Sequence, residues 1–208
     1  MTPLLINVPE KVICFKCIRE RVKNMKKGLK VIAVSAMLAA TQPLCSFGAS
    51  SITVGTGADG VQLEGATSDG AQVSLDSGGT ARLSFAKGKA ATAGLPQAVV
   101  DAINAIDSGN VPLNEAVQDA ELAGYNALVK TSALVVTEIG TQAPATGKVS
   151  QTLYVPNLVE GLGTVQLLFY DNATGKWTLI TPDSVDYTSK KITAGFTGSG
   201  TFSVVYKK

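Results

Sequence analysis

The sequence contains no histidine. This absence excludes Ser-His-Asp and Cys-His catalysis, zinc proteases and most catalytic zinc sites. Cysteine is also scarce, because Cys14, Cys17 and Cys45 are the only three. The chain after Cys45 therefore has no thiol chemistry and no disulfide bonds, so a hydrophobic core must stabilise it.

Charged residues of both signs are few, at 16% of the chain. Eight of the 18 basic residues and two of the 16 acidic residues precede Ser50, which leaves 10 basic and 14 acidic residues, a net charge of −4. A mildly acidic region with dispersed lysines lacks the basic patch of nucleic-acid-binding proteins. We therefore predict no nucleic-acid partner.

A short apolar run behind several lysines predicts export. Met25 begins Met-Lys-Lys-Gly-Leu-Lys, the apolar run Val31–Ala40 follows, and Gly48 and Ala49 each fit a cleavage position. These are the three parts of a secretory signal peptide, and the run is shorter than the ~20 residues that span a bilayer. We assign 25–49 to a signal peptide and expect a secreted, extracellular or cell-envelope protein that meets the membrane only through this peptide.

The residues before Met25 need a separate explanation. Cys14 and Cys17 form a Cys-x-x-Cys pair, which can hold half of a zinc site or act as a redox pair. No second pair and no histidine completes the metal shell. Because signal peptides normally open a chain, we interpret 1–24 as a disordered upstream extension, with Met1 as the alternative start.

The sequence is a poor match to the motifs of two kinds of cell-surface anchor, the lipoprotein signal and the wall-anchoring motif. Cys45 follows Leu44, whereas bacterial lipoprotein signals place a small residue before the lipidated cysteine, so lipidation is the less favoured alternative. The segment Leu95-Pro96-Gln97 is internal and lacks the Thr-Gly and hydrophobic tail of a wall-anchoring motif. We expect a released protein or one held non-covalently on the envelope.

The N-terminal segment 50–94 is rich in Gly, Ser, Thr and Asp and predicts a small β-meander. Asp-Gly turns at Asp59 and Asp69 separate short alternating runs. Asp59, Asp69 and Asp76 also offer hard oxygen ligands for calcium, but the EF-hand and nonapeptide spacings are absent, so turns are the favoured interpretation. The predicted strands are Ile52–Val54, Val61–Leu63, Gln72–Leu75 and Ala81–Phe85.

The pattern changes to helical spacing in the connector 95–124. Apolar residues recur every three or four positions after Pro96, and Gly109 marks the end of this helix. A weaker pattern predicts a second helix from Pro112 to about Ala123. Both helices are short, so we expect them to lie against a sheet edge or end.

The C-terminal part, 125–208, predicts an antiparallel β-sandwich because short strands alternate with turns at regular intervals. The strongest signal is a hairpin around Asp171 and Gly175, in which Val165, Leu167 and Phe169 are expected to meet Trp177 across the pair. Gly198-Ser199-Gly200 is expected to join the last two strands as a hairpin. The predicted strands are Ala133–Ile139, Lys148–Val155, Thr164–Tyr170, Lys176–Thr181, Lys191–Thr197 and Thr201–Tyr206.

Three motifs of this part carry a family resemblance. They are Leu153–Leu158, the hairpin Phe169–Trp177, and the closing segment Gly198–Tyr206. Together they resemble a C-terminal β-sandwich module, of the Ig-like kind, in secreted and cell-surface proteins of Gram-positive bacteria. The resemblance implies a non-catalytic spacer, adhesive or binding unit, and it covers about half of the chain after the signal peptide.

The aromatic residues offer a candidate ligand site. Tyr154, Phe169, Tyr170, Trp177 and Tyr206 could together present a platform for sugar rings. We expect Phe169 and Trp177 to lie in the core, and Tyr154 and Tyr170 to be better surface candidates. The predicted ligand-binding residues are Tyr154 and Tyr170, together with Trp177 because it and Tyr170 flank the hairpin. We predict no catalytic, cofactor or metal site.

These observations favour a structural or interaction protein over two alternatives. A carbohydrate-binding module is the second hypothesis, with cell-wall polysaccharide or another surface protein as the partner. A small glycoside hydrolase is the third, because a carboxylate pair needs no histidine. Asp171 is the one acid beside aromatic residues, and an Asp at that position of a turn bonds its own backbone, so we interpret it as a turn residue.

Overall fold

The computed structural model describes residues 52, 53 and 55–208. The predicted extension 1–24 and signal peptide 25–49, with all three cysteines, lie outside the described residues. Within the described part, no helix has the length and apolar character required to cross a bilayer.

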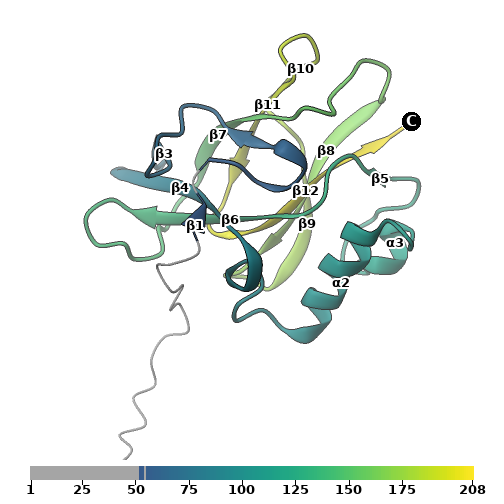
Figure 1. Ribbon diagram of the computed structural model, residues 1–208, viewed down its shortest axis with the longest axis horizontal. Helices are drawn as coiled ribbons and strands as arrows, with labels where there is room; N and C mark the ends of the chain where they lie inside the picture. The colour runs from purple at the N-terminus through teal and green to yellow at the C-terminus, as the bar shows by residue number, and fades with distance from the viewer. Residues whose placement is uncertain (1–51, 54) are drawn as a thin grey trace, which may run out of the picture. The chain divides into compact units, whose positions relative to one another are not determined.

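The described part is mainly β and forms two antiparallel sheets, which confirms the predicted class (Figure 1). The larger sheet has the strand order β1-β4-β6-β12-β8-β9, with β3 paired to β4 and β5 paired to β12. The smaller sheet has the order β10-β11-β7-β2. In the larger sheet the strands are β1 (Ile52–Thr53), β3 (Ala71–Ser74), β4 (Thr80–Ala86), β5 (Asn126–Ala127), β6 (Ser132–Glu138), β8 (Thr164–Asp171), β9 (Lys176–Ile180) and β12 (Gly200–Lys207). In the smaller sheet they are β2 (Gln62–Leu63), β7 (Val149–Tyr154), β10 (Ser184–Asp186) and β11 (Lys191–Phe196).

The main core lies between the two sheets. Four phenylalanine rings run through it in contact, with centroid distances of 6.0 Å from Phe85 to Phe202, 5.7 Å from Phe202 to Phe196 and 5.7 Å from Phe196 to Phe169. Phe196 comes from the smaller sheet and the other three come from the larger sheet. Since these rings are at most 1% exposed, they join the two sheets through apolar burial.

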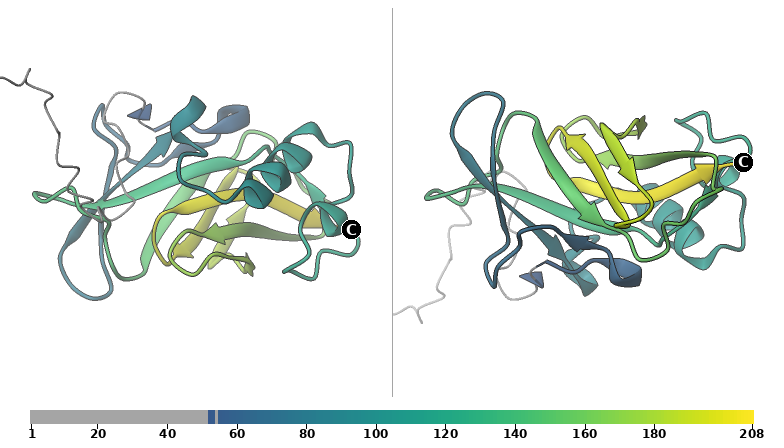
Figure 2. Two further views of the ribbon diagram at one scale, coloured as in Figure 1. Left: turned by 90° about the horizontal axis from the view of Figure 1, so that it is seen from below. Right: turned by 90° about the horizontal axis from the view of Figure 1, so that it is seen from above.

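A second core covers the outer face of the larger sheet. It packs helix α2 (Gln97–Ser108) and the single turn α3 (Leu113–Ala116) against Leu168 and Tyr170 of β8, Trp177 of β9 and Val205 of β12. Figure 2 shows both helices on one side of this sheet. The helices therefore lie over a sheet face, and the predicted position at an edge or end is wrong.

The six strands predicted in the C-terminal part are all present, with bounds that differ by at most one residue at either end. The first helix also forms as predicted, because Pro96 is its N-cap and Gly109 follows it in the left-handed conformation, at φ 65°. The second helix is shorter than predicted. It ends at Ala116 because Val117 is extended (φ −132°) and is itself buried.

The N-terminal segment does not form a β-meander. Strand β2 pairs with β7 in the smaller sheet, while β1 and β3 pair with β4, which itself pairs with β6 in the larger sheet. The segments 50–94 and 125–208 therefore contribute to the same two sheets. A few short strands bury too little apolar surface alone, and here Leu63, Leu83 and Phe85 enter the core between the sheets.

The connection between β11 and β12 is not a hairpin, because it passes from the smaller sheet to the larger one. Ser199 holds this crossing in place: its hydroxyl accepts a hydrogen bond from the Val136 N–H (2.9 Å) and donates one to the Val136 carbonyl (3.3 Å). At Gly200 the backbone lies against β8. A Cβ atom there would come within 2.2 Å of the Tyr170 carbonyl oxygen and 2.5 Å of the Phe169 ring.

We predict that Gly200→Ala destabilises the fold by about 1–3 kcal/mol or more, because the added methyl group meets backbone and a packed ring. Urea unfolding followed by the fluorescence of the buried Trp177 measures the change.

Gly195→Ala is the matched control for Gly200→Ala. Gly195 also lies in a strand, but its added Cβ would meet Cε of Lys148, which is the mobile end of an exposed side chain. We expect a smaller loss of stability in this variant. Equal losses in the two variants would show that the contact with β8 does not determine the requirement at Gly200.

Asp171 closes the β8–β9 hairpin as predicted. Its carboxylate accepts hydrogen bonds from the backbone N–H of Ala173 (2.7 Å) and Thr174 (3.3 Å), and from the Thr197 hydroxyl (2.7 Å). Gly175 has a φ of 69° and donates its N–H to the Asp171 carbonyl at 2.8 Å. Asp171 is only 9% exposed, so these bonds replace its lost hydration.

We predict that Asp171→Ala lowers the free energy of unfolding by about 1–3 kcal/mol, since it removes three hydrogen bonds to a charged acceptor. The measurement is equilibrium unfolding in urea, with Asp69→Ala as the control. Asp69 is an exposed turn residue, and its substitution is expected to stay within about 0.5 kcal/mol of the parent. An Asp171→Ala value inside that same range contradicts the assigned role.

Candidate functional site

The structure does not bring the predicted ligand-binding residues together at the surface. Tyr170 and Trp177 lie directly opposite each other on β8 and β9, with ring centroids 5.2 Å apart. Both are buried beneath the helices, at 3% and 5% exposure, so the expectation of a surface position for Tyr170 is wrong. Tyr154 is half-buried on β7 in the other sheet.

Trp177 also lies on a different face from the one expected. It was predicted to meet Leu167 and Phe169, which point into the core between the sheets. Because Asp171 pairs with Lys176, Trp177 pairs with Tyr170 and shares the outer face with it. Trp177 is buried on this outer face because α2 and α3 cover it.

Two of the N-terminal acids proposed as calcium ligands, Asp59 and Asp76, bond backbone instead. The Asp59 carboxylate accepts the Lys130 N–H and the Asp76 carboxylate accepts the Lys148 N–H, each at 2.7 Å. Among the described residues, no group of three or more Asp, Glu, His or Cys is arranged to hold a metal ion. These carboxylates act as ties between distant segments, because each bonds a backbone about seventy residues away in the chain.

An open depression of about 620 Å³ lies where the α2–α3 loop meets β5 and the end of β12. This volume falls within the ~300–1,000 Å³ of small-molecule sites. Ile106 and Leu113 supply buried apolar surface at its base, at 3% and 5% exposure. We call it the asparagine depression, and it is lined by Ile106, Gly109, Asn110, Val111, Pro112, Leu113, Asn114, Gly124, Tyr125, Asn126, Ala127 and Tyr206.

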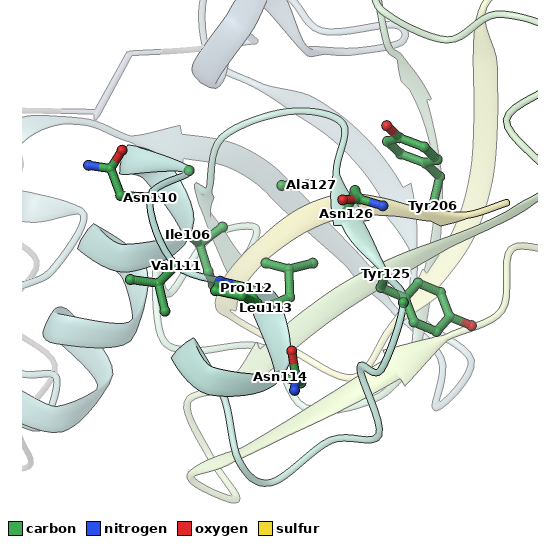
Figure 3. A pocket seen from close by; sticks show the side chains of 12 residues that line it. Ile106, Asn110, Val111, Pro112, Leu113, Asn114, Tyr125, Asn126, Ala127 and Tyr206 are labelled. Carbon is green, nitrogen blue, oxygen red and sulfur yellow. The ribbon is translucent and has the colours of Figure 1, made fainter.

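Three asparagines dominate the polar lining. Figure 3 shows Asn110, Asn114 and Asn126 around a centre formed by apolar side chains that include Leu113. All three are exposed, and within the described residues their side-chain amides form no hydrogen bond with protein. Each amide offers a carbonyl acceptor and two N–H donors, so the rim of the depression can both donate and accept.

Local sequence explains how these three residues come to line one depression. Gly109 ends α2 in a left-handed conformation, and Pro112 is the N-cap of α3, so Asn110 and Val111 lie in the tight connection between the helices. Gly124, at φ 80°, precedes Tyr125 and strand β5 on the opposite side. The depression therefore depends on the two connections on either side of α3.

Tyr125 strengthens the strand side of the depression. Its hydroxyl donates a hydrogen bond to the Gln166 side-chain carbonyl oxygen on β8, and its ring faces the Lys207 ammonium at 5.5 Å from the centroid. A cation above an aromatic face is attracted by the ring quadrupole. The end of β12 and the start of β5 are thus tied together beside Asn126.

A second depression, of about 370 Å³, lies between α2 and the β6 and β12 strands. It contains Lys87, Asn104 and Asp107. The Asp107 carboxylate already accepts hydrogen bonds from the Thr131 N–H (2.7 Å) and hydroxyl (3.0 Å). Since its acid has a structural role, this depression offers less to a ligand than the asparagine depression.

Among the described residues, the one clear pKa shift lies away from both depressions. The Ser189 hydroxyl, the Ser189 and Thr188 N–H groups and Lys191 hold the pKa of the Asp186 carboxyl below its usual value. These groups favour the ionised form, so the resulting stabilisation is present at neutral pH and is lost as the pH falls through the lowered pKa. Because Asp186 is fully exposed in the β10–β11 turn, its shift reflects turn structure.

No sequence pattern predicts the asparagine depression. Tyr206 was named as an aromatic candidate, but no pattern singled out Asn110, Asn114 or Asn126. The available signal was modest: Gly109 and Pro112 mark helix boundaries, and residues between two such boundaries are placed in a loop, where binding residues concentrate.

No protein-family model matches the chain, and no curated protein or solved structure matches it.

Proposed function

We propose that this protein is an exported, non-catalytic interaction module of the bacterial cell surface or extracellular medium. The observation that carries the proposal is the asparagine depression, whose lining residues are all uncharged. General acid–base and nucleophilic catalysis mostly use His, carboxylate, Lys or Cys side chains. The titratable groups that line this depression are the phenols of Tyr125 and Tyr206. A neutral depression on a rigid two-sheet body suits binding instead.

The order of strands β7–β12 supports an Ig-like assignment. In Ig-like sandwiches strands A, B, E and D form one sheet, and C, F and G form the other, sometimes extended by C′. Strands β7, β10 and β11 occupy the B, D and E positions, while β8, β9 and β12 occupy the C, C′ and F positions. The G position beside β12 is filled by β6, which precedes β7 in the chain, so the order is permuted there.

The proposed location rests on the sequence. The basic start, the apolar run Val31–Ala40 and the small residues at Gly48 and Ala49 support export. The resemblance of 125–208 to C-terminal modules of Gram-positive surface proteins supports a bacterial cell-surface setting. A body without disulfide-forming cysteines is compatible with this setting because its layers bury two apolar cores.

We predict that the mature protein starts at Ala49 or Ser50, since cleavage fits after Gly48 or Ala49. N-terminal sequencing of protein recovered from culture medium and from the cell envelope tests this prediction. A mature chain that retains Cys14, or one found only in the cytoplasm, would contradict the proposed export.

We also predict no turnover when the purified protein is incubated with a broad panel of glycoside, ester and peptide substrates. Asp171 is the acid that the sequence placed beside aromatic residues, and its carboxylate is occupied by the hairpin and Thr197. Hydrolysis that survives purification and is lost in Asp171→Asn would overturn the non-catalytic proposal and favour the glycoside hydrolase.

A further inference from the structure

We propose that the asparagine depression binds an uncharged sugar unit of a polysaccharide. This inference rests on the proposed function as an interaction module and adds the class of ligand. It places the binding site at Asn110, Asn114 and Asn126, and away from the buried pair Tyr170 and Trp177.

The absence of charged residues from the lining disfavours ionic ligands. A phosphate or carboxylate would need Lys, Arg or a helix N-terminus of adequate length, and a cation would need carboxylates. None of the residues that line the depression is charged. The single turn α3 is too short to provide a helix-terminus site. The Lys207 ammonium lies over the Tyr125 ring, and Lys207 is not among the lining residues.

The polar rim selects against purely apolar ligands. An apolar molecule that covered Asn110, Asn114 and Asn126 would displace water from amides without replacing its hydrogen bonds, which costs free energy. A sugar unit carries hydroxyls that donate and accept, as the amides do. Its C–H face matches the apolar surface at the base, where Ile106 and Leu113 lie.

The three amides come from separate parts of the fold, and this arrangement fits a ring with hydroxyls on its perimeter. Asn110 lies in the α2–α3 loop, Asn114 in α3 and Asn126 in β5. Figure 3 shows them spaced around the apolar centre. Contacts on several sides of a ring fix its orientation, whereas amides on one side would bind any hydroxyl.

The test is a binding experiment with the purified processed chain on an array of neutral glucans, mannans and galactans, with acidic polysaccharides and uncharged peptides on the same array. We expect retention of at least one neutral polysaccharide. In affinity electrophoresis, substitution of all three asparagines by alanine should weaken that binding about tenfold or more, given the usual contribution of a neutral hydrogen bond.

Two further variants separate loss of binding from loss of folding. Asn114→Asp keeps the side-chain size but replaces an N–H donor with a charged acceptor, so it should weaken binding several-fold while the unfolding midpoint stays near that of the parent. Asn172→Ala removes an exposed amide in the β8–β9 turn, outside the depression, and should leave binding unchanged.

The possible results also separate this inference from the proposed function. Retention on peptides alone, or sugar binding that the triple substitution leaves unchanged, overturns the sugar assignment and leaves an interaction module in place. Absence of binding to every neutral polysaccharide also overturns the sugar assignment. Cleavage of an arrayed polysaccharide overturns the proposed function itself.

Discussion

Burial of the larger sheet on both of its faces is the constraint on which the rest of the structure depends. Leu167 and Leu168 are neighbours on β8 and point to opposite faces, yet both are fully buried, and Val204 and Val205 repeat this arrangement on β12. One face meets the smaller sheet, and α2 and α3 cover the other. Without the helices, Leu168 and Val205 would belong to an exposed apolar patch of the kind that promotes association.

The same constraint explains why the N-terminal segment cannot be separated from the rest of the fold. Phe85 of β4 contacts Phe202 of β12, at 6.0 Å between ring centroids, and β4 pairs with β6 along its length. Since no cysteine follows Cys45, these contacts have no disulfide to assist them. The base of the asparagine depression is held in place by the same packing, because Leu113 belongs to the second core.

The sequence predicted where the strands lie better than how they face. Alternation located the C-terminal strands closely, because a period of two is a local property. Asp171 and Gly175 indicated the hairpin, but the predicted face of Trp177 was wrong. The pairing of Asp171 with Lys176 sets Trp177 opposite Tyr170, on the outer face of the larger sheet. The pairing of β2 with β7 had no local signal, because contacts between distant segments depend on the assembled fold.

The candidate site was missed for the same physical reason. Asn114 and Asn126 are separated in the chain, and they line one depression only because α3 packs on the outer face of the larger sheet, to which β5 belongs. A sequence pattern can identify each turn but not their meeting point. The helical layer that buries Trp177 also provides the apolar base beneath the asparagines. A base fixed by core packing lowers the ordering cost of binding, and this preorganisation supports the polar ligand that we propose for the depression.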